Sequence, residues 1–80
     1  MRLPRDLSGP ELVRALSAVG YAVTRQTGSH IRLTTSMRGE HHVTVPNHAP
    51  LRVGTLATIL AEVAGHLEVS RDELLRRLFG

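Results

Sequence analysis

The pattern of apolar and polar positions along the chain predicts six elements in the order helix, strand, strand, strand, helix, helix. The first helix follows a capping box at residues 8–11, in which the serine hydroxyl and the glutamate carboxylate accept each other's backbone N–H groups. Gly20 is expected to end this helix. Its apolar positions recur at helical spacing and form one stripe, which consists of Leu12, Val13, Leu16 and Val19.

Three short segments with period-two alternation predict strands at residues 21–26, 30–34 and 40–45. A turn at 27–29 joins the first two, a polar loop at 35–39 joins the last two, and Pro46 ends the third. The alternation sends Ile31, Leu33, Val43 and Val45 to one face of the sheet, and His30, Arg32, His42 and Thr44 to the other. Strict alternation puts Arg25 on the side of Tyr21 and Val23, so Arg25 is expected at the strand's end, where its long side chain reaches water.

Two further helices are predicted after the strands. The first begins at Gly54 and ends at Gly65, with an apolar stripe of Leu56, Ile59, Leu60 and Val63. The second begins after another capping box at residues 70–73 and is expected to turn four apolar side chains inward: Leu74, Leu75, Leu78 and Phe79.

Strands with one apolar face need cover on that side only. The predicted fold is therefore α+β: a two-layer α-β-β-β-α arrangement with helices on one face of a three-stranded antiparallel sheet, plus a short C-terminal helix. The length fits a single domain over residues 1–80, with a core at about residues 6–64 and the additional helix at about 70–79.

Composition narrows the class of protein. The chain has no cysteine, which excludes disulfides and thiolate metal sites, and no apolar run of membrane-spanning length, so a cytoplasmic protein without membrane contact is expected. The net charge is +3, and every basic side chain is an arginine. Residues 1–52 carry seven arginines against three carboxylates, whereas residues 53–80 carry three against four. The positive excess around the strands favours a nucleic-acid partner, because phosphate binding by basic groups releases counterions.

The candidate chemistry centres on the segment Gly28-Ser29-His30, in which a tight turn delivers an imidazole to the start of a strand. Histidine is the side-chain type that exchanges protons near neutral pH, and Arg32 lies two residues beyond His30 on the same face. Such a pair suits acid–base work on a phosphodiester, with the histidine moving protons and the arginine stabilising the developing charge. Gly28 and Ser29 would let the backbone approach a ligand. The alternative is that His30 is an ordinary polar residue on a solvated strand face.

A second acid–base group is less evident from the sequence. His42, on a neighbouring strand, and His48, in the loop after Pro46, are both candidates, although each can equally be a solvated strand or turn residue. No metal and no other cofactor is predicted: adjacent His41 and His42 point to opposite faces of a strand, so they cannot both bind one ion.

The order of elements resembles the double-stranded-RNA-binding domain, and the local sequence resembles the HicA-like toxins of bacterial toxin–antitoxin modules. The matching features appear in the family's order over about residues 6–64. They are Ser8-Gly9-Pro10-Glu11-Leu12, Gly20-Tyr21, Arg25-Gln26-Thr27-Gly28-Ser29-His30, Val43-Thr44-Val45-Pro46-Asn47-His48 and Gly54-Thr55-Leu56.

The resemblance implies a type II toxin: an endoribonuclease that cleaves mRNA without a metal, arrests growth and is neutralised by a HicB-like antitoxin. It assigns the catalytic histidine to His30. RNA contacts are expected at Arg25, Gly28, Ser29, Arg32, His42 and His48. Two alternatives on the same scaffold are a non-catalytic RNA-binding module and a protein-interaction domain that docks a partner chain on the open sheet face.

Overall fold

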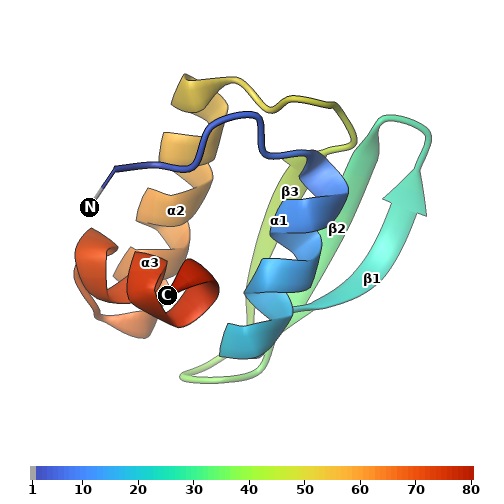
Figure 1. Cartoon of the computed structure of the whole chain (residues 1–80). Helices are drawn as coiled ribbons and strands as arrows, with labels where there is room; N and C mark the ends of the chain where they lie inside the picture. Colours follow the sequence, from blue (N-terminus) through green and yellow to red (C-terminus); the bar gives the residue numbers. More distant parts are fainter. Residues whose placement is uncertain (1) are drawn as a thin grey trace.

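Three strands form one antiparallel sheet with the order β1-β2-β3, and the helices form a layer against one of its faces (Figure 1). The computed structural model describes residues 2–80. The elements are α1 (Gly9–Leu16), which continues as the 3-10 turn η1 (Ser17–Val19), β1 (Ala22–Thr27), β2 (His30–Thr35), β3 (His41–Pro46), α2 (Val53–Leu67) and α3 (Arg71–Phe79). This arrangement confirms the predicted α+β fold.

The start of the first helix is fixed by local chemistry. The Glu11 N–H donates to the Ser8 hydroxyl at 3.1 Å, and the Ser8 N–H donates to the Glu11 carboxylate at 2.9 Å. Together these bonds satisfy two N–H groups that a helix otherwise leaves without partners. At the other end, Gly20 adopts a left-handed conformation with φ 94°, as the predicted helix stop requires.

Gly9 brings the start of α1 into direct contact with the end of β3. Its N–H donates to the carbonyl oxygen of His48 at 2.9 Å. A β-carbon at this position would overlap the carbonyl oxygen of Pro46. Only glycine permits this close approach, which fixes the segment after β3 against the first helix.

The core lies between the sheet and the helical layer. Its side chains with no measurable exposure come from both main helices, from α3 and from the two strands that the helices cover, namely Leu12, Leu16, Leu33, Val45, Leu60, Val63 and Leu74. Helix α2 contacts β3, whereas α3 packs on α2 and α1 (Figure 1). β1 is the edge strand far from α2, and all six of its residues are exposed.

Phe79 departs from the predicted inward stripe of the last helix. It is 40% exposed, whereas Leu74 and Leu75 are buried and Leu78 is partly buried. Successive helical residues are rotated by about 100°, so Phe79 lies at the edge of the stripe that Leu74 and Leu78 define.

Thr35 was expected in a polar loop but is the last residue of β2 and only 2% exposed. It shares the face of Leu33, two residues earlier, so it points toward the helices. Burial is tolerated because its hydroxyl accepts a hydrogen bond from the Met37 N–H at 3.1 Å.

The prediction that α2 ends at Gly65 was wrong by two residues. The helix continues to Leu67, which is buried, and Glu68 then takes the left-handed conformation with φ 58°. The Glu68 carboxylate forms an ion pair with Arg38 in the loop between β2 and β3. Burial of Leu67 therefore outweighs the local tendency of glycine to end the helix. Among residues 2–80, no helix has both the length and the apolar composition needed to cross a bilayer.

Candidate functional site

The face of the sheet opposite the helices carries the polar residues that the alternation assigned to it. His30, Arg32, His42 and Thr44 are all exposed. Across β2 and β3, His30 pairs with Pro46, Arg32 with Thr44, and Thr34 with His42. Paired residues of antiparallel strands share a face, so these side chains occupy successive rungs of one open surface. The predicted placement is confirmed.

Arg25 lies on this open face as well, which the sequence did not predict. The register of β1 against β2 shifts between Val23 and Arg25, so that Val23 pairs with Leu33 but Arg25 pairs with Arg32. Thr24 is the extra residue of a β-bulge, and a bulge reverses the alternation beyond it. The prediction that Arg25 shares the side of Val23 was therefore wrong.

His30 stands at the start of β2 with one ring nitrogen engaged. Its Nδ1 lies 3.2 Å from the Ser29 hydroxyl, whereas its Nε2 has no hydrogen bond within residues 2–80. The turn before it is anchored because the Asn47 N–H donates to the Ser29 carbonyl at 2.8 Å. A β-carbon on Gly28 would meet open space, so this glycine is not required by packing within the chain. Nδ1 of the His30 ring is therefore hydrogen-bonded, whereas Nε2 is available to a ligand.

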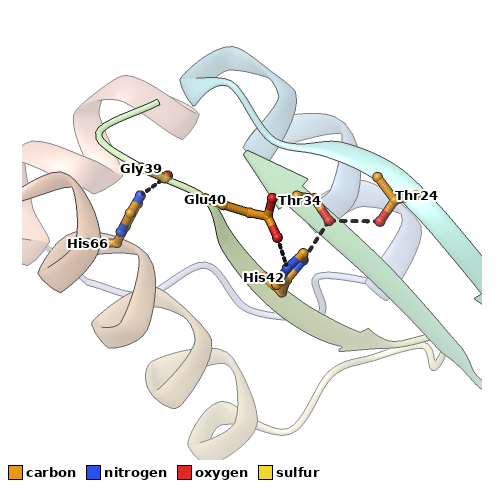
Figure 2. Close-up of polar contacts among 6 residues, drawn as sticks. All are labelled: Thr24, Thr34, Gly39, Glu40, His42 and His66. Carbon is orange, nitrogen blue, oxygen red and sulfur yellow. Dashed lines mark hydrogen bonds and ion pairs between the residues drawn. The ribbon is translucent and has the colours of Figure 1, made fainter. Parts of the chain in front are cut away.

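His42 is held at both ring nitrogens (Figure 2). Its Nε2 donates to the Glu40 carboxylate at 2.8 Å, and its Nδ1 lies 2.7 Å from the Thr34 hydroxyl. The Thr34 hydroxyl in turn lies 2.8 Å from that of Thr24, the bulge residue. The result is a continuous chain of hydrogen bonds across all three strands.

The strand register also sets the distance between the two histidines. His30 pairs with Pro46, and Pro46 lies four residues beyond His42 in β3. Four residues of strand span about 13 Å. A general acid or base must come within hydrogen-bond reach of the proton it moves. His30 and His42 are therefore too far apart to act together on one phosphodiester.

His48 is not brought onto the sheet face. It lies in the segment after β3, where it borders a hollow of about 330 Å³ together with Arg52 and Pro50. Its carbonyl oxygen accepts the hydrogen bond from Gly9 described above. The structure thus places His30, Arg32 and Arg25 on one face of the sheet, whereas His48 lies outside the strands, in the segment after β3.

A groove of about 560 Å³ runs between β3 and α2 and includes His30 and His42 in its lining. Its helix wall holds residues that the sequence analysis missed, among them Thr58 and Glu62. The available signal was their spacing: four residues apart, they occupy one polar face of α2. What the sequence could not supply was the packing of α2 along β3.

A second polar cluster, also missed, lies on the helix side of the sheet. The Tyr21 hydroxyl is 2.8 Å from Nδ1 of His41, and the His41 ring stacks on His66 with centroids 4.4 Å apart. Nε2 of His66 donates to the carbonyl oxygens of Met37 at 2.7 Å and Gly39 at 3.0 Å, the latter drawn in Figure 2. This cluster ties the loop before β3 to α2.

Burial lowers the pKa of His41 below its ordinary value of 6.5, and the neighbouring His66 and His42 lower it further. The Glu62 carboxylate acts in the opposite direction but more weakly than burial. Burial also raises the pKa of Tyr21, so its hydroxyl keeps its proton beside the His41 ring. Folding therefore favours the neutral form of His41.

The protein is expected to lose stability as the pH falls below about 6.5. The unfolded chain then binds a proton at His41 that the folded chain resists, so this contribution is complete above the ordinary pKa and is lost on acidification toward the lowered one. Thermal unfolding midpoints measured from about pH 7.5 to about pH 5.5 should fall, and less steeply in His41→Gln. In His48→Gln, whose exposed ring lies outside the cluster, the wild-type slope should persist. An unchanged slope in His41→Gln would contradict this assignment.

His41 and His42 point to opposite sides of β3, as expected: one toward Tyr21 and His66, the other toward Thr34. Within residues 2–80, no three histidine, aspartate or glutamate side chains are grouped so that they could hold a metal ion.

The fold and its open face define a small α+β domain that presents an exposed histidine beside two arginines on a sheet. The family model described as the HicA toxin of bacterial toxin–antitoxin systems matches residues 9–65, from the start of α1 through most of α2. The chain belongs to this HicA toxin family. No curated protein and no solved structure matches it. Membership implies a partner of the antitoxin kind.

Proposed function

We propose that this protein is a metal-independent endoribonuclease that cleaves mRNA in the cytoplasm, with His30 as its catalytic residue. The observation that carries the proposal is the Nε2 of His30, which has no partner among residues 2–80 and lies on an open face with two arginines that form no ion pair with those residues. RNA contacts are assigned to Arg25, Arg32 and the Gly28–Ser29 turn, with His42 and His48 further along the bound strand.

The pairing of Arg25 with Arg32 supports an anionic ligand. Directly opposed residues in a sheet have β-carbons about 5 Å apart, and like charges at that distance destabilise the fold. Neither guanidinium has an ion pair or hydrogen bond within residues 2–80 to offset this repulsion. A phosphate between them would offset it, because guanidinium groups bind phosphate through two parallel hydrogen bonds.

The chemistry follows from the nucleophile that RNA carries. His30 removes the proton of a ribose 2′-hydroxyl, the 2′-oxygen forms a bond to the adjacent phosphorus, and the bond from phosphorus to the 5′-oxygen breaks. The imidazolium then returns the proton to the departing 5′-oxygen, so one histidine balances the reaction. Arg25 and Arg32 stabilise the negative charge that develops on the phosphate oxygens. His42 is too distant to share these proton transfers and is assigned to binding.

The antitoxin is proposed to be HicB-like and to neutralise the toxin. The exposed sheet face that RNA would occupy has no cover from the chain's own helices, so a partner bound there would exclude the substrate.

The proposal is tested by incubating the purified protein with mRNA in the presence of EDTA, and by expressing it with and without a HicB-like partner. Cleavage in EDTA and growth arrest relieved by the partner are the expected results. Binding of RNA without cleavage would instead identify a non-catalytic RNA-binding module. Loss of cleavage in EDTA would show that the reaction needs a metal.

Replacing either sheet arginine is expected to weaken RNA binding while leaving the fold as stable or slightly more stable. In Arg25→Ala or Arg32→Ala, one phosphate contact is lost and one unfavourable pairing is relieved. For single-stranded RNA, the slope of log affinity against log salt should become shallower by about 0.7 for each contact removed. The measurement uses the His30→Ala background, in which the RNA stays intact.

The matched control is Arg77→Ala on α3, which removes the same charge from a side chain that is paired with Glu73. The salt slope should remain at the wild-type value in this variant. Equal effects of Arg77→Ala and Arg25→Ala would contradict a phosphate site on the sheet.

A further inference from the structure

The groove between β3 and α2 has an apolar floor and a rim of hydrogen-bond acceptors. Val43 and Ile59 line it and are 3% and 5% exposed, so they form its base. Thr44 on one wall and Thr55, Thr58 and Glu62 on the other provide its polar groups. Its volume of about 560 Å³ lies within the range of small-ligand sites.

Two of the rim groups on α2 have lone pairs that accept no hydrogen bond from residues 2–80. The Thr58 hydroxyl donates to the Gly54 carbonyl at 3.0 Å, which leaves its lone pairs for a ligand. The Glu62 carboxylate is exposed and has no hydrogen bond or ion pair within residues 2–80. A carboxylate accepts but does not donate, and it repels phosphate. This wall therefore suits a ligand group that presents N–H donors and carries no negative charge.

The groove begins at the proposed reaction centre and extends away from it. His30 and Pro46 pair with each other and line it beside Gly54, and Glu62 lies eight residues further along α2. Eight helical residues span about 12 Å. A strand of RNA whose phosphate meets His30 would thus direct the base of a neighbouring nucleotide toward Glu62.

We propose that this groove binds an unstacked base of single-stranded RNA next to the cleaved nucleotide and that Glu62 selects guanine there. Guanine presents N1–H and N2–H₂ side by side, which match the two oxygens of one carboxylate. Uracil presents one N–H between two carbonyl oxygens, which the carboxylate repels. Single-stranded RNA is generally recognised in this way, by apolar contact with a base and hydrogen bonds to its edge. The inference rests on the proposed function for the position of the strand.

The experiment maps cleavage ends on an RNA pool with randomised sequence, using wild type, Glu62→Gln and Glu73→Gln. Wild type is expected to favour guanine over uracil about ten-fold at one fixed position beside the cleaved bond. Glu62→Gln should lose most of that preference, because an amide no longer offers two acceptors. Glu73→Gln, the same charge change on α3, should keep it. Thermal unfolding checks that both variants fold.

A second measurement separates failure of the groove from failure of the proposed function. His30→Ala protein, with and without Glu62→Gln, is titrated with short oligonucleotides that carry guanine or uracil at the tested position. If wild type cuts RNA through His30 without a guanine preference, or with one that survives Glu62→Gln, the groove assignment is overturned and the nuclease stands. If wild type does not cleave RNA, but the binding assay shows a guanine preference that depends on Glu62, the groove assignment is supported and the proposed nuclease activity is contradicted. If wild type does not cleave RNA and binding shows no guanine preference that depends on Glu62, both the groove assignment and the proposed activity are contradicted.

Discussion

Bacteria that express the His30→Ala variant are expected to keep growing, whereas expression of the wild-type chain arrests growth. Among residues 2–80, the substitution removes the only imidazole nitrogen that is both on the open sheet face and without a hydrogen-bond partner. Proton transfer by a positioned side chain contributes roughly 10²–10⁴-fold to a rate. A loss of that size leaves too little RNA cleavage to stop growth. The measurement is colony formation after induction, with protein levels compared by immunoblot.

The fold should survive this change, because His30 is exposed and its one side-chain hydrogen bond to the described residues is with the neighbouring Ser29. Gln26→Ala is the matched control: Gln26 lies on the same hairpin but pairs with Ile31, which points to the opposite face. That variant should arrest growth as wild type does. If His30→Ala is as toxic as wild type at equal expression, His30 is not the catalyst.

Gly9→Ala is expected to lower the free energy of unfolding by about 3 kcal/mol, a large part of the roughly 4–12 kcal/mol available to a chain of this length. The added methyl group would overlap the Pro46 carbonyl oxygen, which belongs to backbone and cannot rotate away as a side chain could. Relief requires α1 to move from β3, and this breaks the hydrogen bond from the Gly9 N–H to His48. Chemical denaturation followed by circular dichroism measures the loss.

Gly65→Ala supplies the control for this experiment. Gly65 lies within α2, and a β-carbon there would meet no atom within 4 Å. Because alanine favours the helix over glycine, this variant should be more stable than wild type by about 0.5–1 kcal/mol. A Gly9→Ala protein as stable as wild type would show that the contact between α1 and β3 is looser than described.

Features that depend on neighbouring residues could be predicted from the sequence. The capping box at Ser8 and Glu11 acts over three residues, and so does the serine cap of α3, where the Glu73 N–H donates to the Ser70 hydroxyl. The capping box predicted at residues 70–73 is only half formed, because the Glu73 carboxylate accepts hydrogen bonds from Arg76 and Arg77 instead of from the Ser70 N–H. The alternation within β2 and β3 correctly assigned His30 and His42 to the open face, because each strand keeps its period throughout.

The β-bulge at Thr24 could not be predicted from neighbouring residues in the sequence. It arises from the pairing of β1 with β2, and nothing in the local sequence of β1 marks the extra residue. Its effect on the site is nonetheless large, since it moves Arg25 to the face of Arg32. The alternation alone therefore gave the wrong side for Arg25.

Contacts between distant segments account for the remaining omissions. Tyr21 and His41 are 20 residues apart, and His66 reaches a carbonyl 29 residues away. Glu62 becomes a candidate only because α2 packs beside β3. The distance between His30 and His42 likewise required the register. The local sequence pattern was thus sufficient to identify His30 as the catalytic candidate, whereas the residues around it could be identified only from the tertiary packing.

The most direct test is the rate at which purified protein cleaves one end-labelled RNA in EDTA, measured side by side for wild type and His30→Ala. We expect steady cleavage by wild type and a rate at least about 100-fold lower in the variant, with both proteins folded. Equal rates, or wild-type cleavage that disappears in EDTA, would contradict a metal-independent reaction catalysed by His30.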